Sequence, residues 1–155
     1  GMVEALPFAA GEFDVVLSRF SAHHWRDFAA GLKEARRALK PGGLAIFADA
    51  YASADPLLDT FVQSIELLRD TSHVRDYSLA EWREALTRAG FTPGEPRTRR
   101  LRLEFKSWVE RMSTPPVFVE AIRALEAGAS EAVVRHFDIE PDGSFHLDCM
   151  TLEAQ

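Results

Sequence analysis

Residues 13–49 open with FDVVLS (13–18), pass through AHHW (22–25) and close with LKPGGLAIFAD (39–49). Both ends of this stretch are apolar runs without the alternation of a half-exposed strand, which is typical of strands in a parallel sheet covered on both faces. Between them, apolar residues recur at helical spacing after Asp27 and end at a Pro-Gly-Gly turn. The order strand, helix, turn, strand predicts one parallel crossover unit with a polar residue after each strand.

Length and charge limit the classes of protein to consider. The chain has 155 residues, of which 46% are hydrophobic, and we expect a single domain over residues 1–155. The net charge of −6 argues against a nucleic-acid or membrane partner, because both favour a basic surface. Cys149 is the single cysteine, so no internal disulfide can form. Together with the lack of a long apolar stretch, this predicts a cytoplasmic protein.

The remaining sequence predicts an α/β fold. Asp55-Pro56 and the capping box at Ser78–Glu81 each begin a helix, and the second helix stops at Gly90. Residues 96–105 and 145–152 alternate as strands do, and short helices fill the sequence between them. We therefore expect a mixed sheet of about four strands flanked by helices.

Four motifs resemble a known family. EALPF (4–8), FDVV (13–16), LKPGG (39–43) and PDGSF (141–145) are similar to the methyltransferase type 11 group, which is class I, Rossmann-like and dependent on S-adenosylmethionine (SAM). The order and spacing of the motifs are more specific than any one of them. The resemblance implies SAM as cofactor and a small molecule as methyl acceptor.

The resemblance covers only the C-terminal part of that family. The glycine-rich turn that ends the family's first strand is absent, and Met2 stands where the family has the aspartate that reads adenine. Methionine cannot accept the hydrogen bond that an aspartate accepts. The resemblance thus implies a truncated Rossmann-like fold that lacks the first three family strands.

The resemblance also assigns residues to the cofactor. The segment before the first strand would contribute Val3 and Glu4 to SAM binding. The end of that strand would contribute Ser18, Arg19 and Phe20, because ligands bind beyond the carboxyl ends of strands in open α/β sheets. The alternative is that Ser18 and Arg19 begin an ordinary loop.

Three residues are candidates for catalysis. His23 or His24 could act as a general base, because the unperturbed pKa of histidine lies near neutrality. Asp49 follows the second strand and could orient an acceptor hydroxyl or amine. Methyl transfer can also proceed by positioning alone, in which case His23 shapes the pocket wall, His24 or Trp25 packs against the following helix, and Asp49 caps a turn. We expect no metal, because no third ligand has suitable local spacing.

By the same resemblance, Tyr51, His73 and Tyr77 would border the acceptor. Tyr51 follows the second strand, and the other two lie in a segment that often forms a lid in the family. That segment could equally be a solvated loop.

A strand at residues 13–17 without a neighbour would leave an apolar edge with unpaired backbone groups, which invites pairing with another chain. We therefore expect a homodimer that could form through this strand. Two functions remain open: the catalytic part of a SAM-dependent methyltransferase, or a truncated homologue that serves as an assembly or ligand-binding module without catalysis.

Overall fold

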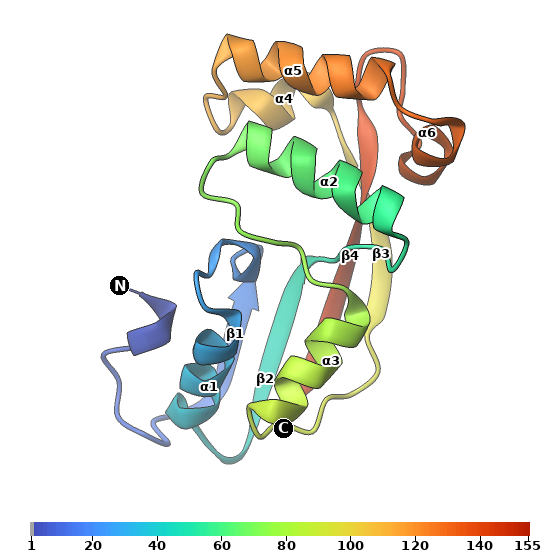
Figure 1. The fold of residues 1–155 in the computed structure, drawn as a ribbon. Helices are drawn as coiled ribbons and strands as arrows, with labels where there is room; N and C mark the ends of the chain where they lie inside the picture. Colours follow the sequence, from blue (N-terminus) through green and yellow to red (C-terminus); the bar gives the residue numbers. More distant parts are fainter. Residues whose placement is uncertain (1) are drawn as a thin grey trace. The chain divides into compact units, whose positions relative to one another are not determined.

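A computed structural model describes residues 2–155, which form two compact units (Figure 1). Unit 1 holds residues 2–51, 76–98 and 149–155, and unit 2 holds residues 52–75 and 99–148. All the residues that carry the candidate catalytic site belong to unit 1. The two units are described separately.

The four strands form one mixed sheet, as the sequence predicts. They are β1 (Phe13–Arg19), β2 (Leu39–Ala50), β3 (Arg97–Leu103) and β4 (Phe145–Ala154), in the order β1-β2-β4-β3. β1 runs parallel to β2, and β2 runs antiparallel to β4. β1 therefore ends the sheet among the described residues, with one edge unpaired.

β2 is longer than the sequence predicts. It begins at Leu39, directly after the helix, rather than after the Pro-Gly-Gly turn. The register with β1 shifts between the pairs Phe13↔Leu39 and Val15↔Leu44, and Gly42 has a φ of 74° there. The Pro-Gly-Gly sequence thus forms a bulge within the strand, where glycine adopts the left-handed conformation that other residues avoid.

The helices begin where their capping residues predict. Asp27 accepts a hydrogen bond from the Ala30 N–H (2.9 Å), and both halves of the capping box of Ser78 and Glu81 are present. The helical elements are η1 (Val3–Ala5), η2 (Ala22–His24), α1 (Phe28–Ala38), α2 (Pro56–Arg69), α3 (Leu79–Arg88), α4 (Phe105–Glu110), α5 (Pro116–Ala127) and α6 (Glu131–Phe137). In the part of the chain that the structure describes, no helix combines the length and apolar character needed to cross a membrane.

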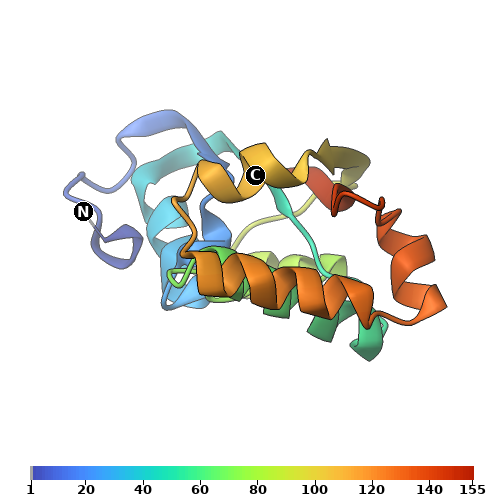
Figure 2. The same ribbon diagram turned by 90° about the horizontal axis from the view of Figure 1, so that it is seen from above.

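Unit 2 is mainly helical. α2 and α5 lie side by side (Figures 1 and 2), and Arg69 of α2 donates a hydrogen bond to the carbonyl oxygen of Trp108 in α4 (3.0 Å). His136 and Asp148 are bonded at 2.8 Å, which ties α6 to the start of β4. These contacts hold unit 2 together internally.

The core of unit 1 lies between one face of the sheet and the helices α1 and α3. Phe47 of β2 packs near Trp82 of α3, with ring centroids 5.5 Å apart. Trp82 in turn makes an edge-to-face contact with Phe28 of α1 at 4.7 Å. Aromatic pairs of this geometry add to the stabilisation from burial, so this cluster fixes both helices on the sheet.

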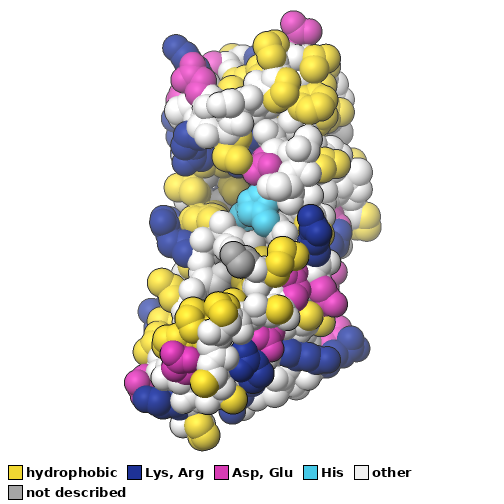
Figure 3. All heavy atoms as spheres, turned by 90° about the vertical axis from the view of Figure 1, so that its left-hand side faces the viewer, with side chains coloured by type: hydrophobic (Ala, Val, Ile, Leu, Met, Phe, Trp, Pro, Cys, Tyr) yellow, Lys and Arg dark blue, Asp and Glu magenta, His cyan; other side chains and the backbone are white. Residues whose placement is uncertain are grey.

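The opposite face of β1 is not covered, which corrects the expectation of a sheet buried on both faces. Val15 is 53% exposed and Leu17 is 64% exposed. Figure 3 looks onto the side of the molecule that carries β1, where hydrophobic side chains reach the surface of unit 1. The apolar run predicted a strand that is buried on both faces, but Val15 and Leu17 are exposed on one of them.

Candidate functional site

The site is organised around the carboxylate of Asp49, at the end of β2. One oxygen, Oδ2, accepts hydrogen bonds from the backbone N–H groups of Ser21 (3.1 Å) and Ala22 (2.8 Å). The other, Oδ1, accepts one from the Ala50 N–H (2.9 Å). Asp49 is 2% exposed, so these bonds replace the water that a buried carboxylate loses. Its position is therefore fixed by backbone, and the segment after β1 is fixed with it.

Phe20 produces the turn that brings this segment to Asp49. Its φ is 46°, in the left-handed region that residues other than glycine seldom occupy. Its N–H still donates to the carbonyl oxygen of Ala48 (2.8 Å), so the turn begins from the last pairing of β1 with β2. Strained backbone of this kind often lies at functional sites, where surrounding contacts hold it in place.

His23 is bound directly to this carboxylate. Its Nδ1 lies 2.5 Å from Oδ1 of Asp49, and its side chain is 11% exposed. Because an ionised carboxylate can only accept hydrogen bonds, the geometry assigns the proton to Nδ1. The other nitrogen, Nε2, is then the ring atom that can take up a proton. The ring of His24 lies 4.1 Å from that of His23, measured between centroids.

Asp76 brings a third side chain to this pair. One potential ligand atom from each of His23, Asp49 and Asp76 lies within 4.8 Å of the other two, and Asp76 is 2% exposed. The segment that carries Asp76 is a loop, which is one of the two alternatives left open from the sequence. The sequence spacing offered no third partner, because Asp76 is far from the other two in the chain. Its position just before the capping box of α3 was the available signal. The three atoms could also hold a metal ion, which the sequence spacing did not predict.

A groove of about 410 Å³ lies beside this cluster in unit 1. Residues from η1 and the following loop, from β1 and from α1 line it, and most are apolar: Val3, Leu6, Phe8, Phe13, Val15, Val16, Leu17, Ser18, Arg19, Ser21, Trp25, Ala35, Ala38 and Phe47. Three of the residues predicted to bind the cofactor therefore share this groove. The walls suit an apolar ring system, and β1 presents polar atoms of Ser18 and Arg19 at its carboxyl end.

The other two predicted cofactor residues do not line the groove. Phe20 forms the turn after β1. Glu4 accepts a hydrogen bond from the Asp27 N–H (3.2 Å), and its bonds to backbone N–H groups, including its own, lower the pKa of its carboxyl. Glu4 therefore connects η1 to the start of α1.

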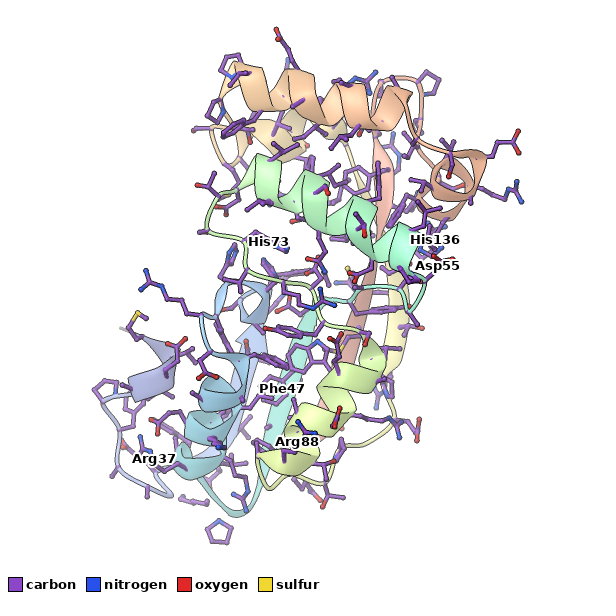
Figure 4. All side chains as sticks on the ribbon, viewed as in Figure 1. Arg37, Phe47, Asp55, His73, Arg88 and His136 are labelled. Atoms are coloured by element: carbon purple, nitrogen blue, oxygen red, sulfur yellow. The ribbon has the colours of Figure 1, made fainter. Side chains whose placement is uncertain are left out.

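Glu34 and Arg37 of α1 bind the backbone of the segment that precedes β1. Glu34 accepts a hydrogen bond from the Leu6 N–H (3.0 Å), and Arg37 donates to the carbonyl oxygen of Phe8 (2.8 Å). Arg37, labelled in Figure 4, also hydrogen-bonds Glu34 at 2.8 Å, and this bond lowers the pKa of the Glu34 carboxyl. The segment that carries EALPF is thereby attached to α1 as one side of the groove.

The residues predicted to border the acceptor divide between the units. Tyr77 stacks on Phe28, with ring centroids 3.9 Å apart and planes 11° apart, and Tyr51 packs against the same core. His73 belongs to unit 2, where its Nε2 bonds Oε1 of Gln63 at 2.8 Å (Figure 4). The role of Tyr51, Tyr77 and His73 toward an acceptor stays a prediction.

Comparison with known proteins points to one family. Residues 1–47 match the family described as "Methyltransferase domain". The YafE protein of Escherichia coli is 45% identical over 154 residues, which are 99% of this chain and 74% of YafE. A demethylmenaquinone methyltransferase of Chlorobaculum parvum is 38% identical over 58 residues, which are 37% of this chain and 24% of that protein.

The similarity extends to structure. The methyltransferase YcgJ of Bacillus subtilis is 32% identical over 152 residues, or 98% of this chain, which spans only 56% of YcgJ. The crystal structure of YcgJ superimposes with a TM-score of 0.94 over 99% of this chain and 68% of the YcgJ chain. Both units thus follow a single known fold, and the relatives are longer than this chain.

Proposed function

Since the chain belongs to the class I, Rossmann-like family of SAM-dependent methyltransferases, we propose that it supplies the acceptor side of a methyl-transfer site, with His23 as general base. One observation carries the proposal. The hydrogen bond between His23 and Asp49 lies at the carboxyl ends of two parallel strands, next to an apolar groove. This is where open α/β sheets bind their ligands.

When bound, SAM supplies a methyl group that its sulfonium already activates. The chain then has to remove a proton from the acceptor and hold the acceptor in line. Asp49 fixes the Nδ1 proton of His23, so Nε2 can accept the proton of an acceptor hydroxyl or amine. A buried, hydrogen-bonded pair is suited to this task because its geometry does not have to be formed during the reaction.

The groove supplies one wall of a SAM site. Val3, Ser18 and Arg19 would face the cofactor, and the apolar lining suits its adenine ring. The chain contains no glycine-rich turn whose backbone could closely approach the ribose and methionine portions of SAM. Met2 stands where the family has the aspartate that binds adenine. We therefore propose that SAM binding needs further polypeptide that covers the edge of β1 and brings that turn. A second copy of this chain covers the edge but brings no such turn.

A small molecule is the proposed acceptor. The net charge of −6 disfavours nucleic acid as the acceptor. The demethylmenaquinone methyltransferase among the relatives is named for a small-molecule acceptor. Acceptors with an ionisable hydroxyl, such as phenols and hydroquinones, fit a histidine base best.

The test is transfer of tritium from methyl-labelled SAM to a panel of phenols, hydroquinones and amines. The chain is mixed with the part of YafE that lies outside the matched region, as a trial source of further polypeptide. We expect labelled product that depends on His23 and favours hydroxyl acceptors. Unchanged transfer in His23→Gln would exclude the proposed base. If the mixture binds no SAM at all, the second function, a non-catalytic assembly or ligand-binding module, takes its place.

A further inference from the structure

Arg19 ends β1 at the edge of the sheet where the His23–Asp49 pair lies. It pairs with Ala48 in the parallel register, so it stands across from the residue that precedes Asp49. Arg19 is exposed and lines the groove in unit 1. Of the described residues that line this groove, Arg19 alone carries a charge. The groove therefore has one positive group, at the end that adjoins the proposed base.

The guanidinium of Arg19 is held in place but is not neutralised. Its central carbon, Cζ, lies 5.2 Å from the centroid of the Phe20 ring, within the range of a cation–π contact. Phe20 adopts the left-handed conformation and its N–H donates to Ala48, so the ring beneath the guanidinium is part of an ordered turn. Within residues 2–155, no carboxylate is paired with this guanidinium. Its hydrogen-bond donors are therefore available to a ligand.

The surface next to Arg19 is apolar. Side chains two residues apart on a strand share a face, and Val15 and Leu17 precede Arg19 at that spacing. Val15 and Leu17 are exposed, and both line the groove. An arginine at the end of an apolar strip suits a ligand with an apolar body and an anionic end. A guanidinium can bind a carboxylate through two parallel hydrogen bonds.

We propose that Arg19 determines acceptor specificity by binding a carboxylate of the methyl acceptor, so that the preferred acceptors are aromatic hydroxy acids rather than neutral phenols. The inference rests on the proposed function, since it places the acceptor between Arg19 and His23. The hydroxyl of the acceptor would face Nε2 of His23, and its carboxylate would face the guanidinium. The backbone of Arg19 remains available to the cofactor.

The acidic side chains near this edge face the interior rather than the groove. Asp49 and Asp76 are each 2% exposed, and each has an oxygen within 4.8 Å of a His23 ring nitrogen. The oxygens of Asp49 also accept three backbone N–H groups, which offset its charge. Neither aspartate lines the groove. An anionic ligand in the groove therefore meets Arg19 as its nearest charge there.

The chain alone can test this contact, without SAM or methyl transfer. The Nε–H signal of Arg19, assigned by its loss in Arg19→Gln, is followed by ¹H–¹⁵N NMR at pH 6 during titration with 4-hydroxybenzoate or its neutral analogue 4-hydroxybenzamide. Dissociation constants come from the backbone amide signals of the groove. We expect 4-hydroxybenzoate to shift the Nε–H signal and to bind about tenfold more tightly than the amide, because charge-assisted hydrogen bonds are the stronger ones. Equal dissociation constants, or no shift with either ligand, would overturn the proposal.

Three variants locate the preference. Arg19→Gln should abolish it, and Arg19→Lys should retain part of it, since an ammonium keeps the charge without the paired hydrogen bonds. Arg26→Gln is the matched control, because Arg26 is also an exposed arginine of unit 1 but does not line the groove. We expect Arg26→Gln to keep the full preference. A preference that persists in Arg19→Gln, or that Arg26→Gln reduces to the same extent, would contradict the proposal.

A competition experiment decides whether the carboxylate at Arg19 belongs to the acceptor or to the cofactor. S-adenosylhomocysteine carries the amino-acid carboxylate of SAM, and 5′-methylthioadenosine lacks it. We expect neither to displace 4-hydroxybenzoate from the chain. Displacement by S-adenosylhomocysteine but not by 5′-methylthioadenosine would assign Arg19 to the cofactor and overturn the proposal. The His23→Gln test of methyl transfer does not depend on these titrations, so the role of Arg19 and the proposed function are decided separately.

Discussion

Nδ1 of His23 lies 2.5 Å from Oδ1 of Asp49, and the other oxygen of that carboxylate binds the backbone just before His23. One buried aspartate thus builds the turn after β1 and orients the side chain that the turn carries. The sequence left open whether Asp49 caps a turn or orients an acceptor group; its bonds to the Ser21 and Ala22 N–H groups hold the turn, and its role toward an acceptor stays a prediction. Because Asp49 both holds the turn and binds His23, a variant of Asp49 changes stability and chemistry together. Variants of His23 are needed to test the chemistry alone.

Asp49→Asn should destabilise unit 1. The substitution replaces a charged acceptor of several backbone N–H groups by an amide with one acceptor oxygen, leaving buried donors unsatisfied. We expect a loss of about 2 kcal/mol in the free energy of unfolding, measured by urea denaturation. Asp14→Asn, which removes an exposed carboxylate paired with Lys40, is the control and should change it by less than about 1 kcal/mol. Equal effects of the two variants would contradict the structural role of Asp49.

His23→Gln should reduce methyl transfer in the reconstituted assay by about 100-fold or more, because a general base commonly contributes that factor. The fold should be retained, since glutamine can still hydrogen-bond Asp49. His24→Gln is the matched control on the same short helix and should retain most of the rate. If the two variants lose activity to the same extent, the base is not His23 alone.

Gly31→Ala should destabilise the chain although alanine favours helices. A Cβ at Gly31 would lie 2.6 Å from Cε3 of Trp25, whose ring packs against α1. We expect the clash to outweigh the helix-propensity gain of about 1 kcal/mol and to lower the melting temperature. Trp25→Leu in the same chain should relieve the clash. A melting temperature at or above that of the original chain would show that the ring moves without cost.

Glu126→Gln should change how stability depends on pH. Burial raises the pKa of the Glu126 carboxyl, opposed by its hydrogen bond with Arg123 (2.7 Å). A folded pKa above the unfolded value gives a contribution that is present below about pH 4.5 and lost as the pH rises through the folded value. The variant should therefore gain stability relative to the original chain between pH 4 and 7, measured by urea unfolding. Glu120→Gln, at an exposed position on the same helix, is the control and should not change the pH dependence. If the free energy of unfolding of Glu126→Gln follows the same pH dependence as that of the original chain, the prediction is wrong.

The homodimer expected from the sequence stays a prediction, with β1 as its contact. The strand has an unpaired edge and exposes Val15 and Leu17, so a second copy could pair with it. We expect sedimentation equilibrium to show a dimer that Leu17→Lys weakens at least tenfold. Val117→Lys is the control, because Val117 is as exposed as Leu17 (64%) but lies in unit 2. A monomer at all concentrations would exclude the dimer.

Local signals predicted most of the fold. Asp27, Asp55 and the capping box at Ser78 begin helices as expected, because side-chain caps are local chemistry. The bulge around Gly42 was missed, since a Pro-Gly-Gly sequence serves equally as a turn or as a bulge. The bare face of β1 was missed because an apolar run does not reveal what covers it.

The sequence named His23 and Asp49 as separate candidates, each after the end of a strand, and did not predict that they contact each other. Their direct hydrogen bond depends on the left-handed turn at Phe20, which no sequence pattern announces for that residue type. Asp76 reaches the pair from a distant segment, so spacing could not predict it.

The most direct test of the account is calorimetric titration with SAM of the purified chain, first alone and then with the part of YafE outside the matched region. The account predicts no saturable heat from the folded chain alone and saturable binding in the mixture. Leu17→Lys, at the groove, should weaken this binding, and Val117→Lys, in unit 2, should not. Binding by the chain alone would contradict the claim that the groove is one wall of the site. A lack of binding in both would contradict the claim that it is a SAM site.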